Sequence, residues 1–311
     1  MILVDSLKVK YNDFCAVDNI SFSVYEQEIF GIIGPNGAGK TSAIECIEGL
    51  RKPHSGKIRV MGLEPWKERK KLHEKIGVQL QYTAYQDRAR VAEICELFSS
   101  LYSNPRPYAS LLEMMDLADK KRAFVSQLSG GQKQKLSIVL ALISNPTLVF
   151  LDEITTGLDP RARHQMWDML LRLRGQGLTI VLVSHYMDEV EAICDRVAIM
   201  NKGRIFNIGT VNDVIRQYDL KEQISFTSSL SDLDGLEKLS NVASVKKDQE
   251  KITIFGDGDD WVVDILRYLE DNNIEYAHFT IKKPDLETVF LNLTGYALAE
   301  DNCSGRQVGR G

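Results

Sequence analysis

With 311 residues, the chain is longer than one average domain, and we expect one large domain together with a smaller one. Its hydrophobic content of 44% and charged content of 26% are typical of a globular protein with a sizeable buried core. The net charge of -5 argues against binding of nucleic acid through bulk charge, and we expect no nucleic-acid partner.

Membrane-spanning and secretory signals are weak in this sequence. The most apolar stretches, residues 136–143 and 178–184, fall well short of the roughly 18–20 apolar residues that a bilayer requires. The first residues carry charges where a signal peptide has its apolar centre, so we expect no signal peptide. Five scattered cysteines without a C-x-x-C pair favour reduced thiols in a cytosolic protein.

Strand-like runs recur through the first two thirds of the chain, at residues 21–34, 147–153, 178–185 and 196–209. The second and third are continuous apolar runs, which is the pattern of strands buried on both faces of an α/β sheet. Helical patterns separate them, and the one at residues 160–177 ends in glycines suited to a helix C-cap. We therefore expect an α/β domain over residues 1–215.

Between about residues 82 and 135 the pattern is almost wholly helical, which predicts a helical subdomain inserted in the α/β domain. From residue 216 to 297, strand, helix, strand, strand, helix and strand patterns follow one another. They predict a small C-terminal α+β domain of the split βαβ type, with a last helix at 284–295. Residues 298–311 have the composition of a flexible tail.

A glycine-rich segment follows the first buried run and satisfies the pattern G-x-x-x-x-G-K-[ST] with Gly34, Gly39, Lys40 and Thr41. Glycines allow the backbone N–H groups to face phosphate, and the helix that begins near Lys40 adds the positive end of its dipole. Lys40 would reach the β- and γ-phosphates, and Thr41 would coordinate Mg²⁺. The alternative is an ordinary glycine turn. The other residues expected to line this ATP site are Asn36, Gly37, Ala38 and Ser42.

Two acidic residues, Asp152 and Glu153, end the apolar run 148–151. Ligands of open α/β sheets bind at the carboxyl ends of the strands, so these carboxylates are candidates for the same site. Asp152 would hold Mg²⁺, directly or through water, and Glu153 would polarise a water molecule against the γ-phosphate. Acidic residues end many strands, and only the phosphate loop upstream makes this pair informative.

A second candidate anion site lies in the segment "LSGGQ", where Ser129, Gly130, Gly131 and Gln132 begin a helical pattern. The serine hydroxyl, backbone N–H groups and helix dipole would together attract phosphate. A chain with one nucleotide has no evident need for two phosphate sites. Two chains that face each other head to tail do, because each lends its second site to the ATP of the other.

With these motifs, residues 1 to about 215 resemble the ATP-binding subunit of an ABC transporter, the family that "LSGGQ" distinguishes from other P-loop proteins. The resemblance implies a P-loop NTPase core of the RecA-like type. It implies that Tyr11 stacks on adenine, that Gln81 contacts the metal or water beside the membrane subunit, that Asp159 links the two ATP sites, and that His185 contacts the γ-phosphate. The alternative for Tyr11 is a surface aromatic. Gln79 is a rival to Gln81, which is preferred because it ends the strand-like run, and Asp159 could also cap the helix that follows.

Two positions depart from the pattern of this family. Ile154 stands where proline is usual after the catalytic glutamate, and Lys135 stands where arginine is common, which keeps the charge but loses a bidentate fork. Neither change removes an acid or base, so we expect ATP hydrolysis. An unrelated P-loop enzyme, such as a nucleotide kinase, and a soluble ABC ATPase that acts on nucleic acid or ribosomes are the alternatives to a transport ATPase.

Residues 215–297, which end in "PDLETVFLNLTG", are similar to the C-terminal region of ATPases from daunorubicin-resistance-type exporters. This similarity implies export through a separate membrane subunit, with this chain at the cytoplasmic face of the cell membrane. Every expected motif is intact, which favours a homodimer, although an intact subunit can also pair with a degenerate one. An importer ATPase is the alternative, and the C-terminal domain could serve only dimerisation or stability. We expect a groove near residues 82–90 to receive a short helix of the membrane subunit.

Overall fold

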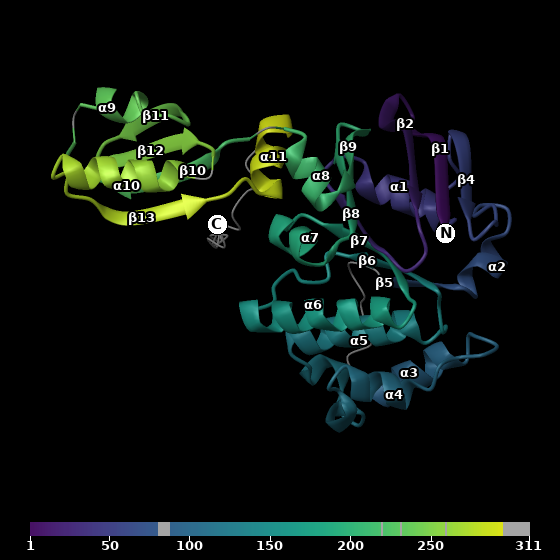
Figure 1. The fold of residues 1–311 in the computed structure, drawn as a ribbon. Helices are drawn as coiled ribbons and strands as arrows, with labels where there is room; N and C mark the ends of the chain where they lie inside the picture. Colours follow the sequence, from purple (N-terminus) through teal and green to yellow (C-terminus); the bar gives the residue numbers. More distant parts are fainter. Residues whose placement is uncertain (80–87, 219, 231, 259, 295–311) are drawn as a thin grey trace, which may run out of the picture. The chain divides into compact units, whose positions relative to one another are not determined.

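The structure is a computed structural model, and it describes residues 1–79, 88–218, 220–230, 232–258 and 260–294 (Figure 1). It divides into two compact units. Among the described residues, the first contains residues 1–211 with residues 293 and 294, and the second contains residues 212–292. Among the helices that the structure describes, none combines the length and apolar character needed to cross a bilayer.

The first unit contains two sheets. An antiparallel sheet has the order β2-β1-β4, and a larger sheet has the order β5-β6-β7-β3-β8-β9, in which only the edge pair β8 and β9 is antiparallel. The strands are β1 Ile2–Tyr11, β2 Phe14–Val24, β3 Ile29–Ile33, β4 Ser55–Val60, β5 Ile76–Gln79, β6 Leu148–Asp152, β7 Thr179–Ser184, β8 Arg196–Asn201 and β9 Arg204–Thr210. The two continuous apolar runs thus form the neighbouring buried parallel strands β6 and β7, as predicted.

The two faces of β3 pack against different partners. Phe30 and Ile32 belong to a hydrophobic core shared with the antiparallel sheet and helix α1. Gly31 faces the other way, where a Cβ atom would lie 3.0 Å from the Sγ of Cys194, just after helix α7. The described helices of this unit are α1 Lys40–Ile47, α2 Arg69–His73, α3 Val91–Ser99, α4 Tyr108–Met114, α5 Gly130–Leu142, α6 Pro160–Gly175 and α7 Met187–Ile193, with the short 3-10 helices η1 Ala118–Lys120 and η2 Val125–Gln127.

The run at residues 21–34 forms two strands in different sheets rather than one continuous strand. The chain turns between β2 and β3, and Gln27 adopts a positive φ of 60° there. The segment expected to be a helical subdomain contains α3, α4, η1 and η2 in its described part and ends within α5. Its helices α3 and α4 pack against each other and against α5 (Figure 1).

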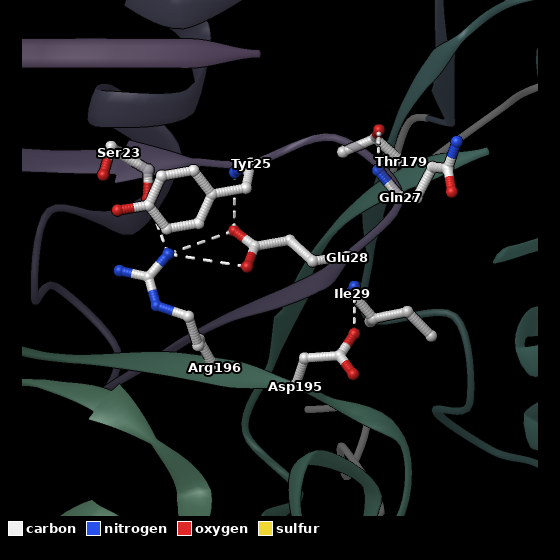
Figure 2. Close-up of polar contacts among 8 residues, drawn as sticks. All are labelled: Ser23, Tyr25, Gln27, Glu28, Ile29, Thr179, Asp195 and Arg196. Atoms are coloured by element: carbon white, nitrogen blue, oxygen red, sulfur yellow. Dashed lines mark hydrogen bonds and ion pairs between the residues drawn. The ribbon is translucent and has the colours of Figure 1, made fainter. Parts of the chain in front are cut away.

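Polar contacts hold the amino-terminal end of β3, which is the end opposite the glycine-rich loop (Figure 2). The buried Glu28 accepts hydrogen bonds from the backbone N–H of Tyr25 at 2.8 Å and from the Nη1 of Arg196 at 3.2 Å. The backbone N–H of Ile29 donates to the Oδ2 of Asp195 at 2.8 Å. The guanidinium of Arg196 also lies 4.7 Å from the centre of the Tyr25 ring. This set of residues, the β3 clamp, joins the first residue of β3 to the start of β8.

The second unit is a four-stranded antiparallel sheet with the order β11-β12-β10-β13. Side chains of β10 and β12 on one face, Ile224 and Ile254 among them, form a core with Trp261 and Ile265 of helix α10. The elements are β10 Glu222–Thr227, α9 Asp234–Glu237, β11 Val242–Asp248, β12 Lys251–Gly256, α10 Trp261–Asp271 and β13 Ala277–Lys282, with α8 Val211–Arg216 before them and α11 Leu286–Thr294 after them. Element order and strand order are those of a split βαβ fold, which confirms this prediction.

Candidate nucleotide-binding site

The glycine-rich loop connects the carboxyl end of β3 to helix α1, which begins at Lys40. A Cβ atom at Gly34 would lie 2.2 Å from the carbonyl oxygen of Met200, so only glycine allows this approach of the two backbones. Gly39 precedes the helix with a φ of 98°, and a Cβ atom there would lie 2.3 Å from the carbonyl oxygen of Ala16. Both glycines are therefore required by the local backbone.

Lys40 is buried, with 7% of its surface exposed, and its side chain folds back onto the loop. The ammonium group donates to the carbonyl oxygens of Gly34 at 2.7 Å and Pro35 at 3.2 Å. Burial lowers the pKa of Lys40, while the negative charges of Glu153 and Asp152 oppose that shift. The lysine thus lies between two acidic groups and the loop carbonyls, where a phosphate oxygen would be a stronger partner.

The acidic pair lies at the end of β6, as the sequence predicted. Burial and the neighbouring Glu153 raise the pKa of Asp152 to about 6, against the attraction of Lys40 and His185. The backbone N–H of Asp152 donates to the Oε1 of the buried Gln79 at 2.9 Å. Glu153 has a positive φ of 49°, which is uncommon for a residue other than glycine and is typical of functional sites.

His185 lies beside Glu153, from the strand next to β6 in the sheet. The Nδ1 of His185 and the Oε1 of Glu153 are 3.1 Å apart. Both side chains are partly exposed, at 28% for His185 and 16% for Glu153. The structure therefore brings together the two residues proposed for water activation and for the γ-phosphate, although they are distant in the sequence.

A buried carboxylate that sequence reasoning missed, that of Glu189, holds the residues next to His185 in place. Glu189 in α7 is fully buried and accepts hydrogen bonds from the Oγ of Ser184 at 2.5 Å and from the Nε1 of Trp167 at 3.3 Å. Burial raises the pKa of Glu189. The Ser184 oxygen in turn accepts from the backbone N–H of Tyr186 at 3.1 Å. Glu189 therefore fixes the residues on both sides of His185.

The loop, the acidic pair and the N-terminal hairpin border one cleft of about 240 Å³. Its oxygen donors include the Thr41 hydroxyl and the carboxylates of Asp152 and Glu153. Oxygen ligands of this kind suit Mg²⁺, which usually takes one or two carboxylates together with substrate phosphates. Within the described part of the chain, no three His, Cys, Asp or Glu residues gather to hold a metal alone. The cleft is lined by Tyr11, Phe14, Ala16, Asn36, Gly37, Ala38, Gly39, Lys40, Thr41, Ser42, Asp152 and Glu153.

Two exposed aromatic side chains border this cleft. Tyr11 was expected from the sequence, and its hydroxyl lies 3.1 Å from the Oγ of Ser42. The guanidinium of Arg51 lies 4.4 Å from the centre of the Tyr11 ring. Sequence reasoning missed Phe14, which is 65% exposed and lines the same cleft. Its position after the turn that joins β1 to β2 was the available signal.

The remaining predicted residues in the described part of the chain, apart from those at the loop and His185, do not line the cleft. Ser129 caps α5, since its Oγ accepts from the backbone N–H of Gln132 at 3.3 Å and its own N–H donates to the Gln132 side chain. Gly130 is exposed, and a Cβ atom at Gly131 would lie 3.3 Å from Leu158. Asp159 is exposed and caps α6, with its Oδ1 accepting from Ala162 at 2.9 Å. Gln81, predicted for catalysis and for the metal, lies outside the described residues.

Comparison with known proteins places this site in a family. The profile of the family described as ABC transporter matches residues 17–156. The daunorubicin resistance ATP-binding protein of Streptomyces coeruleorubidus is 32% identical, over 94% of this chain and 96% of its own length. The Nod factor export ATP-binding protein I of Rhizobium etli is 35% identical, over 92% of this chain and 90% of its own. The chain belongs to the ABC transporter ATP-binding proteins.

Other ABC proteins agree with this assignment. The linearmycin resistance ATP-binding protein of Bacillus subtilis is 32% identical, over 96% of this chain and its own full length. A solved ATP-binding subunit of an ABC transporter is 27% identical with a TM-score of 0.65, over 70% of this chain and 93% of its own. The ADP-bound cassette MJ1267 is 26% identical with a TM-score of 0.61, over 68% of this chain and 92% of its own.

Membership in the ABC family confirms the predicted P-loop core and the prediction that the chain is a transport ATPase. The family match begins at Val17, in β2, and ends after the acidic pair, so it contains the phosphate loop and Lys40. Several relatives that match most of the chain are ATP-binding proteins of resistance and export systems. This ABC protein is therefore a nucleotide-binding ATPase homologous to the exporter type.

Proposed function

We propose that this ABC protein is the ATP-hydrolysing subunit of an exporter, that two copies close around Mg-ATP, and that closure drives a separate membrane subunit. The observation that supports the proposal is that the predicted ATP contacts fall into two groups, one inside the cleft and one outside it. The phosphate loop and the acidic pair border one cleft, with His185 next to Glu153. The capped start of α5 at Ser129 does not line that cleft.

The residues of the cleft suit hydrolysis of a phosphoanhydride. Lys40 and the loop N–H groups would bind the β- and γ-phosphates, and Thr41 and Asp152 would hold Mg²⁺, which when bound neutralises phosphate charge. The carboxylate of Glu153 would accept a proton from the attacking water. His185, 3.1 Å from that carboxylate, would orient it and contact the γ-phosphate. Gln81 would complete the metal and water contacts.

A second copy would supply the rest of the site. The Ser129 hydroxyl and the amino-terminal turn of α5, which do not line the described cleft, would form an anion site. Gly130, Gly131 and Gln132 would contact the γ-phosphate of the partner, and Asp159 would connect the two sites. Closure then depends on the γ-phosphate, and hydrolysis removes the group that holds the copies together.

Export is favoured over import by the second unit as well as by the first. The relatives named for daunorubicin resistance, linearmycin resistance and Nod factor export match at least 92% of this chain, which includes the split βαβ unit. We propose domain limits of 1–215, 216–297 and 298–311, and a task of drug, lipid, glycan or peptide efflux. An importer ATPase remains the alternative. The site of action would be the cytoplasmic face of the cell membrane.

Contact with the membrane subunit is proposed near residues 82–90. Residues 82–87 lie outside the described part of the chain, while Arg88 and Arg90 are exposed. The Nη1 of Arg90 donates to the carbonyl oxygen of Arg122 at 2.7 Å. Charge reversal at Arg88 and Arg90, with alanine at Tyr82 and Tyr85, should reduce copurification with the membrane subunit and the coupled ATPase rate. Unchanged values would show that this placement is wrong.

The dimer is tested by the native mass of Glu153→Gln with Mg-ATP and with Mg-ADP. The substitution keeps the shape of the side chain but removes the carboxylate, so bound ATP is not consumed and the closed state should persist. A dimer with ATP and a monomer with ADP are expected. Ser129→Arg in the same background should abolish the dimer because it places bulk and charge at the helix start. A monomer with both nucleotides would contradict closure of two identical copies.

A further inference from the structure

A second, smaller cavity lies next to the nucleotide cleft and is not used by the proposed mechanism. It measures about 180 Å³ and is bordered by α1 and by the ends of β5, β6 and β7. Thr41 and Asp152 line both this cavity and the cleft. A group bound in it would therefore lie directly behind the two residues proposed to hold Mg²⁺.

The polar lining of this cavity is acidic. Three carboxylates line it, from Glu45, Glu48 and Asp152, and none of its lining residues is a lysine, arginine or histidine. Glu45 is already paired with Arg51, whose Nε lies 2.6 Å from its Oε2. Asp152 belongs to the nucleotide site. Glu48 is thus the carboxylate of this cavity that the mechanism leaves unused.

Glu48 is nearly inaccessible, with 4% of its surface exposed, and its side chain makes no hydrogen bond or ion pair with the described residues. Its backbone is satisfied, since its N–H donates to Ile44 and its carbonyl oxygen accepts from His73 at 2.8 Å. Burial, followed by the charges of Asp152 and Glu45, raises the pKa of Glu48 to about 8. Buried carboxyl groups are normally hydrogen-bonded or paired, so this one is expected to meet either water or a ligand in the cavity that it lines.

The walls of the cavity select among possible cations. Besides its carboxylates, it is lined by the apolar side chains of Ile44, Leu50 and Phe150. A metal ion would need several convergent oxygen ligands, and the described residues offer no such cluster. A methylene chain with a cationic end matches both parts of the lining, because it can pack on apolar walls while its head meets a carboxylate. The volume is below that of drug-sized pockets and suits one side chain or a small amine.

We propose that this cavity, the Glu48 pocket, binds an alkylammonium or alkylguanidinium group, with the cationic head on the Glu48 carboxylate and the alkyl stem against Ile44 and Phe150. The group has two possible sources. It is either a lysine or arginine side chain of the membrane subunit, a source that rests on the proposed function, or a free amine.

The test on the isolated protein is titration with n-butylammonium and n-propylguanidinium at pH 9, where Glu48 is ionised and both probes remain cationic, followed by ligand-observed NMR at constant ionic strength. Saturable binding is expected, with about tenfold or greater weakening in Glu48→Gln, because a charge-assisted contact is lost. Glu45→Gln is the matched control, since it removes a carboxylate that lines the same cavity but is already paired. Tetramethylammonium, which has no N–H donor, should not bind. No binding to the wild-type protein, or equal binding to Glu48→Gln, would overturn the proposal.

The two sources are separated by repeating the titration on the complex with the membrane subunit. If a side chain fills the pocket, the complex no longer binds n-propylguanidinium, and Glu48→Gln lowers the ATPase stimulation by that subunit. If the ligand is a free amine, binding persists in the complex. ATP-dependent dimerisation is measured on the same preparations. The first titration needs neither ATP nor a membrane, so it reports on the Glu48 pocket alone. ATP-dependent dimerisation reports on the proposed function, and the two proposals can therefore fail independently.

Discussion

Replacing Glu189 by alanine should weaken both the fold and the ATPase activity, because this carboxylate connects Trp167 to the strand end before His185. The substitution leaves the hydroxyl of Ser184 and the indole N–H of Trp167 buried without their acceptor. Each such group costs about 1–3 kcal/mol, so we expect a loss of roughly 2–6 kcal/mol of unfolding free energy. In a domain of this size, 1 kcal/mol shifts Tm by about 2–4 °C.

The functional part of this prediction concerns the position of His185. Measured well below either Tm, kcat for ATP should fall while KM changes little, because Glu189 does not line the nucleotide cleft. Glu189→Gln should recover most of both losses, since an amide of the same shape can accept from one partner and donate to the other. Asp188→Ala is the control: it removes an exposed ion pair with Arg163 and should cost less than about 1 kcal/mol. A Glu189→Ala protein with unchanged Tm and kcat would refute the reasoning.

Three further predictions concern the cleft and its neighbourhood. The raised pKa of Glu48 means that the native state holds a proton more tightly than the unfolded state. Stability should therefore fall as pH rises from about 4.5 to about 8, by at most about 1.4 kcal/mol per unit, and urea unfolding of Glu48→Gln should lack this fall. Gly34→Ala should lose ATP binding in equilibrium titrations, because its Cβ atom would overlap the Met200 carbonyl oxygen. Gly37→Ala should lose less, because its Cβ atom meets nothing within 4 Å and the cost is limited to backbone strain at a φ of 80°. Phe14→Ala and Tyr11→Ala should each raise the Kd for ATP several-fold if both aromatics contact the base, and an unchanged Kd would exclude that residue.

The sequence was sufficient for features that depend on local pattern. The phosphate loop, the continuous strands β6 and β7, the capped helices α5 and α6, and the split βαβ unit each follow from residue types at fixed spacing. The turn between β2 and β3 was harder to see, because apolar residues continue on both sides of it. Only the pairing of β2 with β1 and of β3 with β7 reveals two separate sheets.

Features that depend on distant contacts could not be predicted. Asp188, Glu189 and Glu191 are three acidic residues in the single short helix α7, and the sequence does not show which one points toward Trp167. Glu48 follows an apolar helix and has the same local pattern as an exposed C-terminal residue. Its burial results from packing of α1 beside β5 and β6, which brings Glu48, Gln79 and Phe150 around one cavity although they are distant in the sequence.

The β3 clamp has a consequence for how the phosphate loop is placed. β3 is a strand of five residues in parallel register between β7 and β8, and a slip by one residue would turn Phe30 toward Cys194, where even a Cβ atom is tightly placed, and Gly31 toward the core shared with α1. Asp195 and Arg196 hold the first residues of β3 to the start of β8, while at the other end Gly34 abuts the carbonyl oxygen of Met200, also in β8. Contacts with the neighbouring strand β8 thus fix both ends of β3. The position of the phosphate loop therefore also depends on contacts between β3 and β8 at the amino-terminal end of β3, five residues before Gly34.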